Sequence, residues 1–195
     1  MSSQKNAPWP TVTDGELELF VAHSNRIEGE PDRPGHPLFD HHLALAREVA
    51  DTPPRWWDPL DIHRRLLASQ KDKFPGEMRQ VGVSVGGKMK LHPIDVREEL
   101  PRLMVDMDYG MRPSLGEELE QPKREAWCWG MHHRFEWIHP FWDGNGRTGR
   151  LWMNALRLSL GLPWLTVRYE DRFDYYRSIE GWEREHEEKL RRASD

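Results

Sequence analysis

The stretch that decides how this chain folds is His139-Pro-Phe-Trp-Asp-Gly-Asn-Gly-Arg-Thr-Gly-Arg150. Gly144 and Gly146 allow the backbone to turn sharply and to approach a ligand closely, so that successive N–H groups point at one anion. Leu151–Leu160 has the composition of an apolar helix. The turn therefore lies at a helix N-terminus, where unpaired N–H groups and the positive end of the helix dipole favour phosphate.

The polar side chains of this stretch suit phosphate chemistry. Asp143 is a hard oxygen ligand of the kind that Mg²⁺ prefers beside a polyphosphate. Arg147 and Arg150 lie about one turn apart on the same helix face, where both guanidinium groups can bind phosphate oxygens. His139 stands at the other end of the stretch, free to accept a proton from a hydroxyl. Together they predict a site that moves or binds a phosphorylated group.

The stretch resembles the signature of the Fic family (Fic/Doc fold), His-x-Phe-x-Asp/Glu-Gly-Asn-Gly-Arg-x-x-Arg, and fills every fixed position. The resemblance implies a mainly α fold, a Fic-type helical bundle with a single β-hairpin flap over the active site. It also implies that ATP is bound with Mg²⁺ and that AMP is transferred to a Ser, Thr or Tyr hydroxyl of a target protein, with release of pyrophosphate.

The resemblance assigns a role to each fixed position of the signature. His139 becomes the general base and Phe141 the apolar anchor of the loop. Asp143 becomes the Mg²⁺ ligand. The remaining positions bind the phosphates of the nucleotide: Gly144, Asn145 and Gly146 hold the α- and β-phosphates, and Arg147 and Arg150 reach the β- and γ-phosphates.

A second segment, running from Ser24 to Gly29, resembles the inhibitory-helix motif Ser/Thr-x-x-x-Glu-Gly/Asn of self-restrained relatives. It assigns an inhibitory role to Ser24, Glu28 and Gly29 on a helix over about residues 16–29. Glu28 would pair with Arg150 and stop the γ-phosphate from seating. The alternative is an ordinary helix that Gly29 merely ends.

Two further segments extend the resemblance. Val81, Val83 and Val85 alternate before Gly86-Gly87, which predicts a hairpin over about residues 76–91. In the Fic family this would be the flap, whose strand edge aligns an extended target segment, including a segment of the protein itself. Tyr175-Tyr176 resembles a tyrosine pair in the nucleotide pocket of several relatives, which implies contact with adenine, against the alternative of ordinary packing. The base preference stays open.

The periodicity predicts one domain over residues 14–195 after a flexible arm over residues 1–13. Its helices are expected as follows: Asp14 to about Gly29, capped by Asp14; a helix capped by Asp40; Pro59–Leu67; Val96–Met107, broken or begun at Pro101; Pro122–Ile138, with Trp127, Met131, Arg134, Phe135 and Ile138 inward; a central helix from Leu151 to Leu160; and one or two helices over Asp171–Leu190.

Composition limits the partners. The 28 basic and 33 acidic residues give a net charge of −5, so no basic field recruits nucleic acid. No apolar stretch reaches membrane-spanning length. Cys128 is the only cysteine, which excludes an intrachain disulfide, fits a cytoplasmic protein and suggests a buried thiol. The oligomeric state stays open.

Three other functions fit the same residues. Glu28 could align a water that removes AMP from a modified protein. The same fold could use another donor and move UMP, phosphocholine or phosphate. Finally, the chain could bind a nucleotide without catalysing a reaction.

Overall fold

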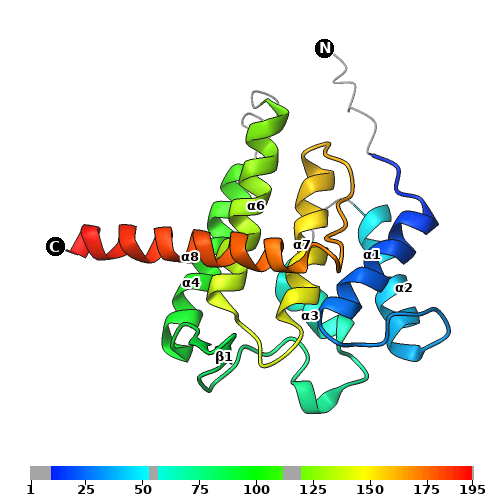
Figure 1. Ribbon diagram of the computed structural model, residues 1–195, viewed down its shortest axis with the longest axis horizontal. Helices are drawn as coiled ribbons and strands as arrows, with labels where there is room; N and C mark the ends of the chain where they lie inside the picture. The colour runs from blue at the N-terminus through cyan, green and yellow to red at the C-terminus, as the bar shows by residue number, and fades with distance from the viewer. Residues whose placement is uncertain (1–9, 53–56, 112–119, 195) are drawn as a thin grey trace.

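The computed structural model describes residues 10–52, 57–111 and 120–194, and in these ranges it is a bundle of α-helices with one two-stranded antiparallel hairpin (Figure 1). The predicted fold class is confirmed. Most of the predicted arm, residues 1–9, lies outside the described residues. The elements are α1 (Asp14–Ile27), α2 (Pro37–Asp51), α3 (Pro59–Leu66), a 3₁₀ turn (Lys71–Lys73), β1 (Ser84–Val85), β2 (Lys88–Met89), α4 (Pro93–Gly110), α6 (Gln121–Ile138), α7 (Asn145–Ser159) and α8 (Arg172–Ser194).

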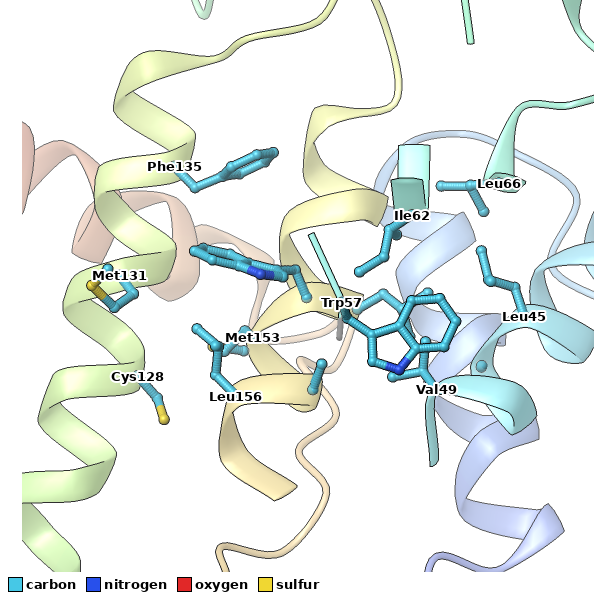
Figure 2. Packing of buried hydrophobic residues seen from close by; sticks show 14 of the residues in the cluster. Leu45, Val49, Trp57, Ile62, Leu66, Cys128, Met131, Phe135, Met153 and Leu156 are labelled. Atoms are coloured by element: carbon cyan, nitrogen blue, oxygen red, sulfur yellow. The ribbon is translucent and has the colours of Figure 1, made fainter. Parts of the chain in front are cut away.

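The central helix is α7, as its apolar sequence predicted. It packs against α6 on one side and against α1, α2 and α3 on the other. Figure 2 shows Met153 and Leu156 of α7 within the cluster whose other labelled members include Cys128, Met131 and Phe135 of α6 and Leu45, Val49, Ile62 and Leu66 of α2 and α3. A helix buried on almost every side has few alternative positions, so the loop before it is rigidly mounted.

The C-terminal segment forms one long helix, α8, which packs across α6 (Figure 1). Tyr175, Ile179 and Glu183 are its buried residues nearest the site, four residues apart. Side chains at that spacing lie on one face of a helix, so this face of α8 points into the molecule and the rest is solvated.

Two helix starts differ from the prediction. The N-cap of α1 is Thr13 and not Asp14, because Thr13 and Glu16 form a reciprocal capping box. The N-cap of α2 is His36 and not Asp40, because Pro37 suits the first helical turn. Asp40 accepts a hydrogen bond from the Gly35 N–H instead.

The hairpin is much shorter than predicted. The Gly86-Gly87 turn is correct, with φ of 58° and 80°, but only two residues pair on each side of it. Val81 and Val85 are 50% and 44% exposed, so the alternating valines have no apolar face to pack on. The stems are held by Arg79, which is buried and donates to the carbonyls of Val81 and Leu91.

The remaining helices settle three expectations. Residues around Pro101 form the single helix α4, which begins at Pro93, so Pro101 neither breaks nor begins it. Arg134 is only partly buried, and it pairs with Glu99 and Asp106 of α4 instead of packing in the apolar core. Cys128 is buried, and burial raises the pKa of its thiol to about 12. In the described ranges, no helix combines the length and apolarity needed to cross a bilayer.

Candidate active site

His139 lies at the C-terminal end of α6 in a left-handed conformation, with φ of 48° and ψ of 62°. Its N–H donates to the Phe135 carbonyl at 2.9 Å, and the Arg79 guanidinium donates to the His139 carbonyl at 2.7 Å. Burial, followed by the charge of Lys90, lowers the pKa of the His139 ring to about 3. The ring is therefore neutral at neutral pH and can accept a proton.

The loop after His139 is locked by Asn145. The Asn145 side-chain amide accepts from the Phe141 N–H and donates to the Phe141 carbonyl, both at 2.9 Å. Phe141 is fully buried, and its ring stacks on His63 with 3.7 Å between the ring centroids. The turn that contains Asn145 was expected to hold phosphate. Both polar atoms of the Asn145 side chain hold the loop instead, so only the backbone N–H of Asn145 is left for that role.

The glycine turn forms the predicted cradle at the start of α7. Gly144 is the N-cap in a left-handed conformation (φ of 75°), and α7 begins at Asn145, so the N–H groups of the first turn have no helical partner. A Cβ at Gly146 would overlap the carboxylate of Glu28 and lie 2.9 Å from a guanidinium nitrogen of Arg150. The missing side chain of Gly146 thus leaves a space that Glu28 occupies.

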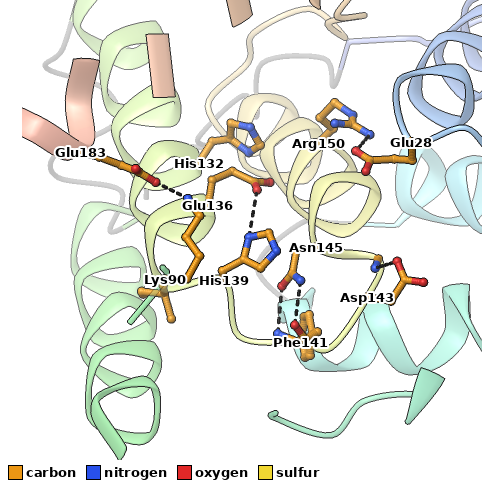
Figure 3. Close-up of polar contacts among 12 residues, drawn as sticks. Glu28, Lys90, His132, Glu136, His139, Phe141, Asp143, Asn145, Arg150 and Glu183 are labelled. Atoms are coloured by element: carbon orange, nitrogen blue, oxygen red, sulfur yellow. Dashed lines mark hydrogen bonds and ion pairs between the residues drawn. The ribbon is translucent and has the colours of Figure 1, made fainter. Parts of the chain in front are cut away.

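Arg150 is held by the serine and the glutamate of the predicted inhibitory motif, and Figure 3 shows its contact with Glu28. Its guanidinium donates to Glu28 Oε1 at 2.8 Å, to Ser24 Oγ at 3.0 Å and to the Ser24 carbonyl at 2.9 Å. Burial by itself would lower the pKa of Arg150, but the charge and hydrogen bond of Glu28, together with Tyr175 and Glu136, outweigh burial and the pKa is raised. Gly29, with φ of 70°, follows Glu28 where α1 ends, so the residues of the motif both end the helix and hold Arg150.

Asp143 and Arg147 have partners that the sequence did not indicate. Asp143 accepts from Lys73 Nζ at 2.7 Å, and Arg147 forms an ion pair with Glu30, with 3.0 Å between Nη2 and Oε1. Burial works to raise the pKa of Asp143, but Lys73 and the Gly144 N–H lower it overall. Neither Lys73 nor Glu30 belongs to a recognisable motif, and only the folded chain brings them to the loop.

The Asp143 carboxylate is a suitable ligand for a Mg²⁺ ion that is also bound by phosphate oxygens. Asp143 is ionised and its side chain is 33% exposed. Across the described residues there is no group of three or more His, Cys, Asp or Glu side chains that could enclose a metal ion. Mg²⁺ commonly binds through one carboxylate together with substrate phosphates and water, which a single Asp143 can satisfy.

A cavity of about 760 Å³ opens beside His139 and Arg150, within the size range of ligand pockets. Tyr175 and Tyr176 both line it, with 5.7 Å between their ring centroids, but they differ in exposure. The hydroxyl of Tyr175 bonds to His132 at 2.9 Å, and its ring lies 5.8 Å from the Arg150 guanidinium carbon. Tyr176 is 37% exposed and is the ring that remains open to a base.

The outer wall of the cavity joins the hairpin to α8. Lys88 and Lys90 of the hairpin segment both pair with Glu183 of α8, which is 2% exposed, and Lys88 also pairs with Glu187 at 3.1 Å. Sequence reasoning missed this wall, because its acidic residues lie in a charged helix that looks like an ordinary solvated face.

The family model described as the Fic/DOC family matches residues 57–156, which include the whole signature and half of the chain. The chain belongs to the Fic/DOC family. Residues Ser24 to Gly29 lie outside the matched range, so membership by itself says nothing of the inhibitory contact.

Curated relatives of this Fic chain bear the name protein adenylyltransferase. The one from Nematostella vectensis is 33% identical over 119 residues, which is 61% of this chain and 26% of that protein. The one from Culex quinquefasciatus is 35% identical over the same share of this chain and 22% of its own length. The match therefore spans about a quarter of these relatives.

Solved structures agree with the fold. A Fic domain-containing signaling protein from Bacteroides thetaiotaomicron aligns with a TM-score of 0.69 at 19% identity, covering 86% of this chain and 71% of the other. A fragment of Fic-1 from C. elegans aligns with a TM-score of 0.61 at 25% identity, covering 84% of this chain and 54% of the other. The helical bundle with its short hairpin is thus the Fic fold.

Proposed function

We propose that this protein is an adenylyltransferase that moves AMP from ATP to a Ser, Thr or Tyr hydroxyl of a protein, and that Glu28 restrains it. The relatives named protein adenylyltransferase support the choice of AMP as the transferred group. The complete signature around a neutral His139 supports transfer as the reaction. The restraint rests on the chain's own contacts.

The observation that carries the proposal is the position of the Glu28 carboxylate. It lies against Gly146 and accepts a hydrogen bond from Arg150, so it fills the end of the cradle where an anion would bind. A carboxylate and a phosphate compete for the same guanidinium donors. While Glu28 holds Arg150, the γ-phosphate of ATP cannot bind this guanidinium. The triphosphate then binds in an orientation from which AMP is not transferred.

The reaction is a substitution at the α-phosphorus. The acceptor oxygen forms the new P–O bond as the bond to pyrophosphate breaks, and the hydroxyl proton passes to His139. The first N–H groups of α7 and the arginines neutralise the phosphate oxygens once Glu28 and Glu30 release Arg150 and Arg147. Fixed charges and positioning supply most of the rate in such chemistry. Mg²⁺, held by Asp143 and the phosphates, would neutralise charge on the leaving pyrophosphate.

The target is proposed to dock along the hairpin. Val85 and Met89 are 44% and 65% exposed, and Val85, Gly86 and Lys88 also line the cavity that contains His139. A two-stranded ribbon with free outer edges can pair with an extended segment through backbone hydrogen bonds. Such pairing would bring a hydroxyl side chain of the segment to the base, and a segment of the protein itself could serve as well.

The proposal is tested by labelling with ATP that carries the label on either the α- or the γ-phosphate, in the presence of Mg²⁺. Glu28→Gly protein should label itself or a target from α-labelled ATP only. Glu18→Gly, which removes an exposed carboxylate from the same helix, should stay at the wild-type level. Glu28→Gly combined with His139→Ala should be silent.

Other outcomes would point to the rival functions. Label arriving from the γ-phosphate would indicate a kinase, and label from another nucleotide would indicate a different donor. If Glu28→Gly abolishes removal of AMP from a modified protein and gains no transfer, the chain is a de-AMPylating enzyme. If calorimetry shows that Glu28→Gly protein binds ATP but no turnover is detected, the chain is a nucleotide-binding module without catalytic activity.

A further inference from the structure

Two polar side chains, His139 and Glu136, face each other beside the cavity, and each has a buried polar atom without a hydrogen-bond partner among the described residues. Within the part of the chain that the structure describes, Nδ1 of His139 makes no hydrogen bond, and neither does Oε1 of Glu136, which lies three residues earlier on α6. Nδ1 of His139 is 3.8 Å from Oε2 of Glu136, and Figure 3 shows the carboxylate directed at the ring. Leaving both groups unpaired in a dry site is costly, so the arrangement calls for a function.

The backbone creates this contact. Because His139 ends α6 in a left-handed conformation, its ring lies next to the last turn of the helix, where Glu136 is 6% exposed. Gly149 of α7 makes room for the carboxylate, since a Cβ there would lie 2.6 Å from Glu136 Oε1. A small movement of either side chain would shorten 3.8 Å to a hydrogen bond, as catalytic contacts often tighten when substrate binds.

We propose that Glu136 is a positioning residue, which holds His139 with Nδ1 protonated and Nε2 facing the acceptor hydroxyl. The inference rests on the proposed function in that His139 is the base. During transfer the hydroxyl proton moves to Nε2 as the oxygen bonds to phosphorus and pyrophosphate leaves. The carboxylate stabilises the resulting imidazolium and does not take the proton itself, and the ring later returns its proton to solvent.

The charges around the pair fit this role. Burial raises the pKa of Glu136 to about 7, against the lowering effects of Arg150 and Lys90, while Glu28 and Glu183 add to the rise. The His139 ring faces the charges of Lys90, Arg79 and Asp143. A cationic ring among these groups needs a nearby anion, and among the side chains facing it Glu136 is the carboxylate directed at Nδ1.

The first test is independent of activity. Nitrogen-15 spectra of the histidine rings at pH 7, with His139→Asn for assignment, should show His139 protonated on Nδ1. Glu136→Gln should give a mixture of tautomers, and Glu136→Asp should keep the wild-type form. Glu99→Gln is the matched control, because Glu99 is a partly buried carboxylate that pairs with Arg134 of the same α6. A His139 ring protonated on Nε2, or one indifferent to Glu136→Gln, would overturn the proposal.

The second test uses transfer kinetics in the Glu28→Gly background. Glu136→Gln should lower kcat about 10- to 100-fold, below the full loss of a general base, with KM for ATP within about twofold. The rise of kcat with pH near neutrality should flatten, and Glu136→Asp should recover part of the rate. An unchanged kcat, or a KM effect alone, would contradict a positioning role.

The two proposals fail separately. If Glu28→Gly transfers no AMP while the tautomer responds to Glu136→Gln, the proposed reaction is wrong and the Glu136–His139 pair stands. If transfer occurs and Glu136→Gln changes neither kcat nor the tautomer, the pair is wrong and the reaction stands. If Glu136→Gln does not fold, the wild-type tautomer and Glu136→Asp decide the question.

Discussion

At the scale of single residues, the site is defined by carboxylates that face cationic or basic partners. Glu28 faces Arg150, Glu30 faces Arg147, and Asp143 faces Lys73. Each cation that would bind phosphate or lie beside it is already neutralised within the chain. If the proposed function is correct, this pattern is that of a resting site in which the protein's own carboxylates occupy the positions of the substrate's phosphate oxygens.

If Glu28 restrains transfer as proposed, the Ser24 hydroxyl, which also binds Arg150, should share the restraint. Ser24→Ala removes the 3.0 Å bond from Arg150 Nε but keeps the bond to the Ser24 carbonyl. A hydrogen bond to a charged group contributes about 1.5–3 kcal/mol, so basal labelling should rise about tenfold and remain below that of Glu28→Gly. Ser178→Ala on α8 is the control. Labelling by Ser24→Ala at the wild-type level would show that Glu28 restrains Arg150 without Ser24.

Glu136 should make the protein less stable as pH rises. Its pKa is raised from 4.5 to about 7 in the folded protein, so the folded state keeps a proton that the unfolded chain loses. The stabilisation is complete below pH 4.5 and is lost as pH passes 7, by about 3 kcal/mol. Glu136→Gln should therefore gain stability relative to wild type between pH 5 and pH 8 in urea unfolding. An equal difference at both pH values would contradict the buried carboxylate.

At the scale of elements, α6, the signature loop and α7 form one rigid unit. The sequence predicted this unit well, because the helical periodicity, the glycine turn and the fixed spacing of polar residues are all local. Long-range partners were not predictable, since Lys73, Glu30 and Glu183 come from segments whose local pattern is only polar. The length of the hairpin was overestimated for a related reason. An alternating pattern of valines does not show whether their side chains pack against another part of the molecule.

The loop lock can be separated from its contribution to stability with two matched variants. Asn145 makes two bonds to the Phe141 backbone, and Asn154 on the same helix makes two similar bonds to Leu165 at 2.9 and 2.7 Å. Either Asn→Ala change should cost about 2–4 kcal/mol, because buried backbone groups lose partners. In the Glu28→Gly background only Asn145→Ala should abolish transfer. Equal losses of transfer in both variants would reduce Asn145 to a stabilising role.

At the scale of the whole molecule, the helices enclose several histidines in the neutral state. Burial lowers the pKa of His63 to about 4 and of His132 and His139 to about 3, and burial also lowers the pKa of His42. The fold thus keeps rings neutral both in the site and beneath it. The packing of α3 against α7 explains why His63, far from the signature in sequence, stacks on Phe141.

These histidines should make the protein labile in mild acid. Below pH 6.5 the histidines of the unfolded chain bind protons, whereas the buried rings of the folded protein stay neutral. The contribution of these rings to the free energy of unfolding is therefore complete above pH 6.5 and is lost as the pH falls toward 3. Glu136 acts in the opposite direction between 4.5 and 7. Because more rings than the single Glu136 carboxyl take up a proton on unfolding, the free energy of unfolding should fall below pH 6.5, by about 1.4 kcal/mol per pH unit for each net proton taken up. Urea unfolding between pH 7 and 4.5 measures the slope, and a flat profile would contradict neutral burial.

The central claim is that Glu28 occupies the phosphate seat of an otherwise complete transferase. The most direct measurement is the intact mass of wild-type and Glu28→Gly protein after incubation with ATP and Mg²⁺. The account predicts one or more added AMP groups on Glu28→Gly, little or none on wild type, and none when His139→Ala is added. An unmodified Glu28→Gly mass, with each nucleotide and with candidate targets present, would contradict it.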